Sequence, residues 1–114
     1  MYDTAHGFDC SFERRPLGNF GRCEVLSFHA TKVFNTFEGG AMVTNDDALA
    51  ETMQLMRNFG FRGYDNVVHP GTNGKMVEIN AAMGLVNLDA VEGFVPKLVP
   101  KRDQITTPIR KIPA

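Results

Sequence analysis

The chain has 114 residues, of which 43% are hydrophobic and 22% are charged, and its formal net charge is −1. This length and composition are typical of one globular domain with a modest core. A near-neutral chain has no basic excess for nucleic acid or an anionic membrane surface, so neither partner is expected. No apolar run approaches the ~20 residues of a membrane span and no signal peptide precedes Tyr2, so we expect a cytoplasmic protein.

The first motif along the chain is the run YDTAH at residues 2–6. By itself, such a run is equally typical of a turn or a helix cap. Its meaning depends on the next element, residues 23–28 (CEVLSF), whose apolar residues predict a buried strand. If Asp3 ends a strand beside that one, its carboxylate lies at the edge where ligands of open α/β sheets gather.

The predicted strand leads directly into the run SFHATKVFNTFEGG, residues 27–40, which places a hydroxyl, an imidazole and an amine within six residues. A lone lysine beside a strand is most often a surface residue. Lysine is also the side chain that condenses with an aldehyde, as in enzymes that use pyridoxal 5'-phosphate (PLP). PLP needs a carboxylate against its pyridine nitrogen. Asp3, 29 residues before Lys32, therefore favours the functional interpretation.

Further along, Gly39 and Gly40 predict a turn, and residues 41–44 predict a second short strand. A helix is predicted through about Asn58, capped by Asn45 or Asp46. Three apolar side chains recur in it at helical spacing and are predicted to pack in the core: Leu49, Met53 and Met56.

The segment 59–76 has no periodicity and is predicted to be a long loop, which in a compact domain is usually functional or disordered. A long helix is predicted from Glu78, with Pro96 and Pro100 interrupting it. Its apolar side chains recur along one stripe: Ile79, Ala82, Met83, Val86 and Val91. Small residues in the same helix would permit close approach of another element: Ala81, Ala82 and Gly84. Residues 101–114 have the composition of an unstructured tail.

Three blocks together give the chain a close resemblance to the DegT/StrS family of nucleotide-sugar aminotransferases. They are YDTAH at 2–6, SFHATKVFNTFEGGA at 27–41 and GTNGKMVEINAA at 71–82. The resemblance implies an α/β fold, namely part of the PLP-binding large domain of an aspartate-aminotransferase-like enzyme, over residues 1–100. The form of the middle block is similar to the branch that acts on dTDP-linked keto-deoxysugars. One departure is GFD at residues 7–9, where the family usually has Ala-x-Gly.

The resemblance also implies roles for five residues. Lys32 matches the lysine that binds PLP covalently and then moves the proton between the substrate carbon and the cofactor. Asp3 matches the carboxylate on the pyridine nitrogen, His6 the Gln or His beside the ring, and Ser27 the hydroxyl that binds the phosphate. Asn73 matches an asparagine that reaches across a dimer to the partner's phosphate, so a homodimer is expected for the complete protein.

By the same resemblance, the complete protein would transfer an amino group from glutamate to a keto carbon of a nucleotide-linked deoxysugar, in the biosynthesis of a lipopolysaccharide or antibiotic sugar. Enzymes of this type are much longer than 114 residues and have two domains, so the chain alone is expected to be inactive. The alternative is a non-catalytic remnant or binding protein that keeps the fold elements without turnover.

The remaining thiols and imidazoles predict no metal site. Cys10 and Cys23 lack metal-ligand spacing, and a cytosolic context favours two free thiols over a disulfide. His6, His29 and His69 are too scattered to suggest ligation and are interpreted as packing or hydrogen-bonding residues.

Overall fold

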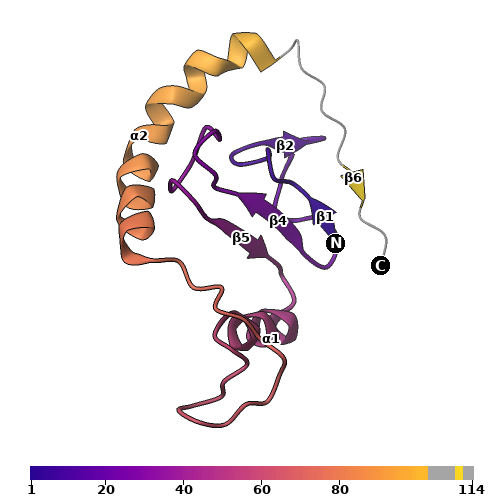
Figure 1. The fold of residues 1–114 in the computed structure, drawn as a ribbon. Coiled ribbons are helices and arrows are strands. Elements are labelled where there is room, and N and C mark those ends of the chain that lie inside the picture. The colour runs from indigo at the N-terminus through magenta and orange to yellow at the C-terminus, as the bar shows by residue number, and fades with distance from the viewer. Residues whose placement is uncertain (103–109, 112–114) are drawn as a thin grey trace.

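The computed structural model describes residues 1–102 and 110–111, which form a small mixed sheet, a separate hairpin and two helices (Figure 1). The four-stranded sheet has the order β5-β4-β1-β6. Its strands are β1 (Tyr2–Asp3), β4 (Glu24–Ser27), β5 (Gly40–Val43) and β6 (Arg110–Lys111). The short strands β2 (Ser11–Phe12) and β3 (Arg15–Pro16) pair with each other in a second sheet.

The two strands predicted within residues 22–44 are confirmed as neighbours. β4 pairs antiparallel with β5 from Glu24↔Val43 to Ser27↔Gly40. β1 runs parallel to β4, with Asp3 opposite Val25. The predicted arrangement, in which Asp3 ends a strand beside the strand that carries Ser27, is therefore confirmed.

The helix α1 (Asp47–Arg57) begins where the sequence predicts. Asp46 is its N-cap, because one carboxylate oxygen accepts a hydrogen bond from the backbone N–H of Leu49 at 3.0 Å. The predicted core packing of α1 is wrong in part, since no residue of the helix is buried and Met56 is 41% exposed. Of the three residues predicted to pack in the core, Leu49 and Met53 are half-buried.

The segment between the helices is the predicted long loop, and it folds back on itself. Phe59 N–H donates to the carbonyl of Thr72 at 3.0 Å, and isolated bridges join Asn58 to Asn73 and Phe61 to Val67. Gly60 sits at the centre of this fold with a φ of +78°, where a Cβ would lie 1.7 Å from the carbonyl oxygen of His69. Only glycine fits there.

The helix α2 (Glu78–Arg102) begins as predicted, but it continues through both prolines. The expected break at Pro96 and Pro100 is therefore wrong. A proline removes only its own N–H donor and crowds one carbonyl, which a helix can accommodate as a bend. Of the predicted tail, residues 101–102 end α2 and Arg110–Lys111 pair with β1, while 103–109 and 112–114 lie outside the described residues.

Few side chains of the described part are buried. They are Thr4, Cys23, Glu24, Phe34 and Thr36. Glu24 is fully buried, and its carboxylate accepts hydrogen bonds from the backbone N–H groups of Gly18 and Phe20 at 2.8 and 2.5 Å. The sheet is thus covered only in part within this chain.

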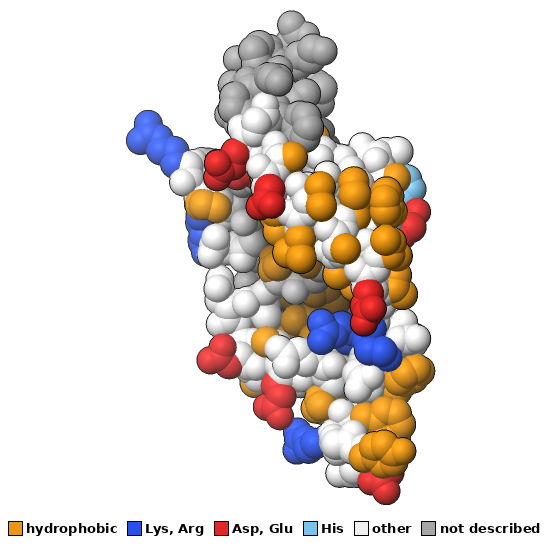
Figure 2. Space-filling model, turned by 90° about the vertical axis from the view of Figure 1, so that its left-hand side faces the viewer, with side chains coloured by type: hydrophobic (Ala, Val, Ile, Leu, Met, Phe, Trp, Pro, Cys, Tyr) orange, Lys and Arg blue, Asp and Glu red, His pale blue; other side chains and the backbone are white. Residues whose placement is uncertain are grey.

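A large apolar surface is left open instead. Figure 2 shows it on the side of the molecule where α2 lies. The predicted apolar stripe of α2 points largely to this surface, since Ile79 and Val86 are 66% and 63% exposed. Other large apolar side chains exposed on or next to α2 are Val77, Leu85 and Leu88. In the described part of the chain, no helix is long and apolar enough to cross a membrane.

Candidate active site at the carboxyl edge of the sheet

Two strands deliver a carboxylate and a hydroxyl to the same edge of the sheet. Because β1 and β4 are parallel, Asp3 and Ser27 both lie at carboxyl ends. Thr4, 5% exposed, fixes this register, since its N–H and its hydroxyl both donate to the carbonyl of Val25 at 3.0 Å. Asp3 is itself exposed, and its Oδ1 accepts a hydrogen bond from the backbone N–H of Ala5 at 3.0 Å.

The amine of Lys32 lies against the imidazole of His6. Its Nζ is 3.1 Å from Nε2 and 3.4 Å from Nδ1 of that ring, across 26 residues of sequence. Lys32 is half-buried and His6 is exposed. An amine within hydrogen-bond reach of an imidazole is a nucleophile beside a group that accepts or holds a proton.

Three phenylalanines hold the two segments that carry this pair. Phe8, two residues after His6, stacks on Phe34 with ring centroids 4.2 Å apart and an interplanar angle of 15°. Phe28 meets both rings edge-on, at 6.1 and 4.9 Å. Phe34 is only 5% exposed. The aromatic cluster therefore joins the N-terminal segment to the loop of residues 28–39 that carries Lys32, here called the lysine loop.

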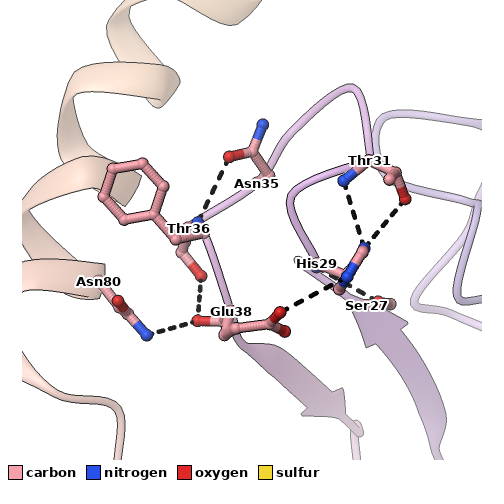
Figure 3. Close-up of polar contacts among 8 residues, drawn as sticks. Ser27, His29, Thr31, Asn35, Thr36, Glu38 and Asn80 are labelled. Carbon is pink, nitrogen blue, oxygen red and sulfur yellow. Dashed lines mark hydrogen bonds and ion pairs between the residues drawn. The ribbon is translucent and has the colours of Figure 1, made fainter.

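Polar contacts close the lysine loop at its two ends (Figure 3). His29 Nδ1 accepts a hydrogen bond from the N–H of Thr31 at 3.3 Å, which leaves Nε2 to face a carboxylate oxygen of Glu38 at 3.5 Å. The N–H of His29 donates to the hydroxyl of Ser27 at 3.4 Å. The predicted packing or hydrogen-bonding role of His29 is confirmed, and Ser27 is tied to the same network.

The fifth predicted residue, Asn73, lies elsewhere in the chain. It is exposed in the loop between α1 and α2, where it forms a bridge with Asn58. Together with the turn residues Gly39 and Gly40, it lines an open hollow whose wall also includes Lys75 and Asn80. The structure thus brings together Lys32 and His6, places Asp3 and Ser27 at the same sheet edge, and sets Asn73 in a separate hollow.

The remaining predictions concern thiols and metals. Cys10 and Cys23 are both free, as predicted. Among residues 1–102 and 110–111, no group of three or more His, Cys, Asp or Glu side chains is arranged to hold a metal ion.

Sequence reasoning missed two residues of this region, Asn80 and Asn87 on α2. Both amide side chains donate to backbone carbonyls of the lysine loop, Asn80 to Glu38 at 2.8 Å and Asn87 to Asn35 at 2.7 Å. The signal was present as two asparagines seven residues apart in a largely apolar stretch of the helix, since that spacing places both on one face.

Proteins of known structure with this fold are PLP-dependent sugar aminotransferases, and this chain is a partial α/β version of that fold. DesI, solved in the presence of its TDP-sugar product, is 49% identical with a TM-score of 0.72, over 80% of this chain and 23% of that one. The PLP-form of a putative sugar aminotransferase from Streptococcus pneumoniae is 29% identical with a TM-score of 0.70, over 80% and 25%.

The chain belongs to the DegT/DnrJ/EryC1/StrS aminotransferase family, whose model matches residues 1–113. A dTDP-4-amino-4,6-dideoxy-D-glucose transaminase of Shigella dysenteriae is 44% identical over 95 residues, which are 83% of this chain and 26% of that protein. Other relatives carry the names of UDP- and GDP-linked sugars. The chain spans about a quarter of the length of the relatives it matches.

Proposed function

We propose that this chain is the lysine-bearing segment of a PLP-dependent aminotransferase that acts on a nucleotide-linked sugar. The observation that carries the proposal is the contact between Lys32 Nζ and His6 Nε2 at 3.1 Å, beside the sheet edge that holds Asp3 and Ser27. The family and the names of the relatives support the same reading.

The side chains at this edge fit PLP by their chemistry. An amine is available for the aldehyde, a carboxylate for the pyridine nitrogen and a hydroxyl for the phosphate. PLP, when bound, supplies the electron sink for the carbanion formed at the substrate carbon. We propose that Lys32 holds the cofactor and carries the proton that leaves and returns at that carbon.

The other residues position these groups. Asp3 Oδ1 accepts a hydrogen bond from the N–H of Ala5, which leaves Oδ2 to accept from the ring nitrogen. Ser27 Oγ accepts from the N–H of His29, which leaves the hydroxyl hydrogen to donate to a phosphate oxygen. His6 lies beside the amine and would flank the ring.

The finer parts of the proposal concern substrate and assembly. We propose a dTDP-linked keto-deoxysugar as the amino acceptor, supported by the Shigella dysenteriae relative and by DesI, which was solved with a TDP-sugar. Glutamate is proposed as the donor. The complete protein is proposed to be a homodimer in which Asn73 reaches the partner's phosphate, and its separation from Lys32 within one chain suits that role.

The test uses the chain completed with the segments it lacks from the Shigella dysenteriae relative. PLP should give a visible absorbance band, and glutamate with a dTDP-4-keto-6-deoxysugar should give the amino sugar. Lys32→Ala should abolish band and product together. Asp3→Asn should retain some bound cofactor and lose turnover, because the electron sink is lost. Continued transamination by Lys32→Ala would refute the proposed role of the lysine.

A second candidate is a non-catalytic remnant or binding protein that keeps the fold elements. The observation that favours it is the openness of the site, where Asp3 and His6 are exposed and Lys32 is only half-buried. The 114-residue chain by itself should then bind PLP weakly or not at all. Borohydride reduction that leaves the cofactor covalently attached to Lys32 of the unextended chain would contradict this candidate.

A further inference from the structure

The face of α2 that turns toward the lysine loop is polar and small. Two side-chain hydrogen bonds join this face to the loop, from Asn80 Nδ2 to the carbonyl of Glu38 at 2.8 Å and from Asn87 Nδ2 to the carbonyl of Asn35 at 2.7 Å. Between them, Gly84 is buried, and a Cβ there would lie 3.0 Å from Cγ2 of Thr36. The spacings of four and three residues put all three on one side of the helix.

Two backbone carbonyls of the lysine loop face the helix, those of Asn35 and Glu38. The ends of the loop are joined by Phe28 N–H to the carbonyl of Gly39 at 2.8 Å and by Thr36 N–H to the carbonyl of Phe28 at 2.9 Å. Backbone carbonyls left without donors at such a contact cost free energy. Asn87 supplies the donor to the Asn35 carbonyl, whereas Asn80 supplies a second donor to the Glu38 carbonyl, which also accepts from the hydroxyl of Thr36 at 2.9 Å (Figure 3).

The path from α2 to the lysine is short. Asn87 donates to the carbonyl of Asn35, and the side chain of Asn35 donates to the carbonyl of Lys32 at 3.3 Å. Thr36, the next residue, is 2% exposed and lies against Gly84. The hydrogen bond from the Asn35 side chain therefore couples the position of Asn35 to the backbone of Lys32.

We infer that Asn80 and Asn87 are positioning residues that hold the lysine loop against α2 and so fix the Lys32 amine beside His6. Asn80 anchors the end of the loop near β5, and Asn87 anchors the part next to the lysine. The inference rests on the proposed function only in taking Lys32 as the reactive amine. The hydrogen bonds themselves do not depend on a cofactor.

The first measurement is amide hydrogen exchange on the 114-residue chain without cofactor. Asn87→Ala and Asn87→Asp should raise exchange at the N–H groups of Phe28 and Thr36 about three- to tenfold, the effect of one lost hydrogen bond. The aspartate keeps the shape of asparagine and has no N–H to donate. The N–H of Thr4, bonded to Val25 in the sheet, should not change.

Two further variants separate a local effect from general unfolding. Asp89→Ala, on an exposed position of the same helix two residues away, should leave exchange in the lysine loop unchanged. Asn80→Ala should raise exchange mainly at Glu38, whose N–H donates to the carbonyl of Thr36 at 2.9 Å. Equal exchange in wild type, Asn87→Asp and Asn80→Ala would overturn the inference, as would an equal rise in Asp89→Ala.

The second measurement uses the completed enzyme with limiting PLP, borohydride reduction and peptide mapping. Asn87→Asp should lower the fraction of Lys32 that carries the reduced cofactor at least threefold, and Asp89→Ala should not. An unchanged fraction in Asn87→Asp would overturn the positioning role. A wild type without label on Lys32 would instead refute the proposed function, and hydrogen exchange alone would then decide whether α2 holds the loop.

Discussion

The aromatic cluster of Phe8, Phe28 and Phe34 should control both the stability of the chain and the site geometry. Phe34 is the most buried of its members, 5% exposed, and it stacks on Phe8 at 4.2 Å. Replacing Phe34 with Ala removes the contact that joins the N-terminal segment to the lysine loop. His6 would then no longer be held beside Lys32.

The magnitude follows from the burial of the ring. Truncation of a buried phenylalanine to alanine costs about 3–5 kcal/mol, through lost transfer free energy and the cavity left behind. The expected cost of Phe34→Ala lies within that range. Each aromatic pair that the ring forms, with Phe8 and with Phe28, adds about 0.5–1.5 kcal/mol beyond the burial of its area. A domain has a free energy of unfolding of only about 5–15 kcal/mol, so this replacement would remove a large part of it.

Phe37→Ala is the matched control, since it lies three residues later in the same loop and is 47% exposed. Phe37 has a φ of +63°, which is as unfavourable for Ala as for Phe, so the replacement should cost less than about 1 kcal/mol, as at other exposed positions. Urea unfolding followed by far-ultraviolet circular dichroism measures both free energies. Equal losses for Phe34→Ala and Phe37→Ala would refute the assignment of the aromatic cluster as the link between the two segments.

Three further outcomes are expected. The 114-residue chain should associate at micromolar concentration because of its exposed apolar surface, and a monomer by light scattering would contradict this. The carboxylate of Asp46 accepts a hydrogen bond from the N–H of Leu49 and pairs with Arg22, and both contacts lower its pKa below the usual value of 3.8. The stability that the ionised Asp46 contributes is therefore fully present above pH 3.8 and is lost as the pH falls through its pKa in the folded protein. In thermal melts, the melting temperature of the wild type should fall more steeply with decreasing pH than that of Asp46→Ala. Equal slopes would exclude the cap as the cause. In the completed enzyme, Ser27→Ala should weaken PLP binding by about 1–3 kcal/mol in a spectrophotometric titration; unchanged affinity would remove Ser27 from the phosphate site.

Local patterns were enough to predict β4, β5 and the start of each helix, but not the short strands β2, β3 and β6. The strand before Ser27, the strand after Gly40 and the cap at Asp46 depend on residues close in sequence, so they are visible in a single chain. The placement of Asp3 beside β4 was only a condition of the sequence argument, because residues 1–6 carry no strand pattern of their own, and the parallel pairing of β1 with β4 comes from the structure.

The orientation of α2 was not predictable from periodicity. An apolar stripe was expected to mark the inner face, yet Ile79 and Val86 are exposed, and the side toward the lysine loop has Asn80, Gly84 and Asn87. Hydrophobic periodicity identifies the helix face that is buried by apolar packing. The contact between α2 and the lysine loop is instead formed by hydrogen bonds from asparagine side chains to backbone carbonyls.

The contact between Lys32 and His6 was implied by the family resemblance, but its physical cause lies in tertiary packing. The two residues are 26 positions apart, and stacking of Phe8 on Phe34 brings their segments together. The spacing of residues in the sequence does not predict this contact. The departure at residues 7–9 is where Phe8 enters the cluster.

The central claim is that Lys32 is the residue that holds PLP. Its most direct test is borohydride reduction of the completed enzyme with PLP, followed by proteolysis and mass spectrometry. The chain offers four other lysines as internal competitors: Lys75, Lys97, Lys101 and Lys111. The reduced cofactor should be found on the peptide that contains Lys32 and should disappear in Lys32→Ala. Label on another lysine of the wild type, or unchanged label in Lys32→Ala, would contradict the claim.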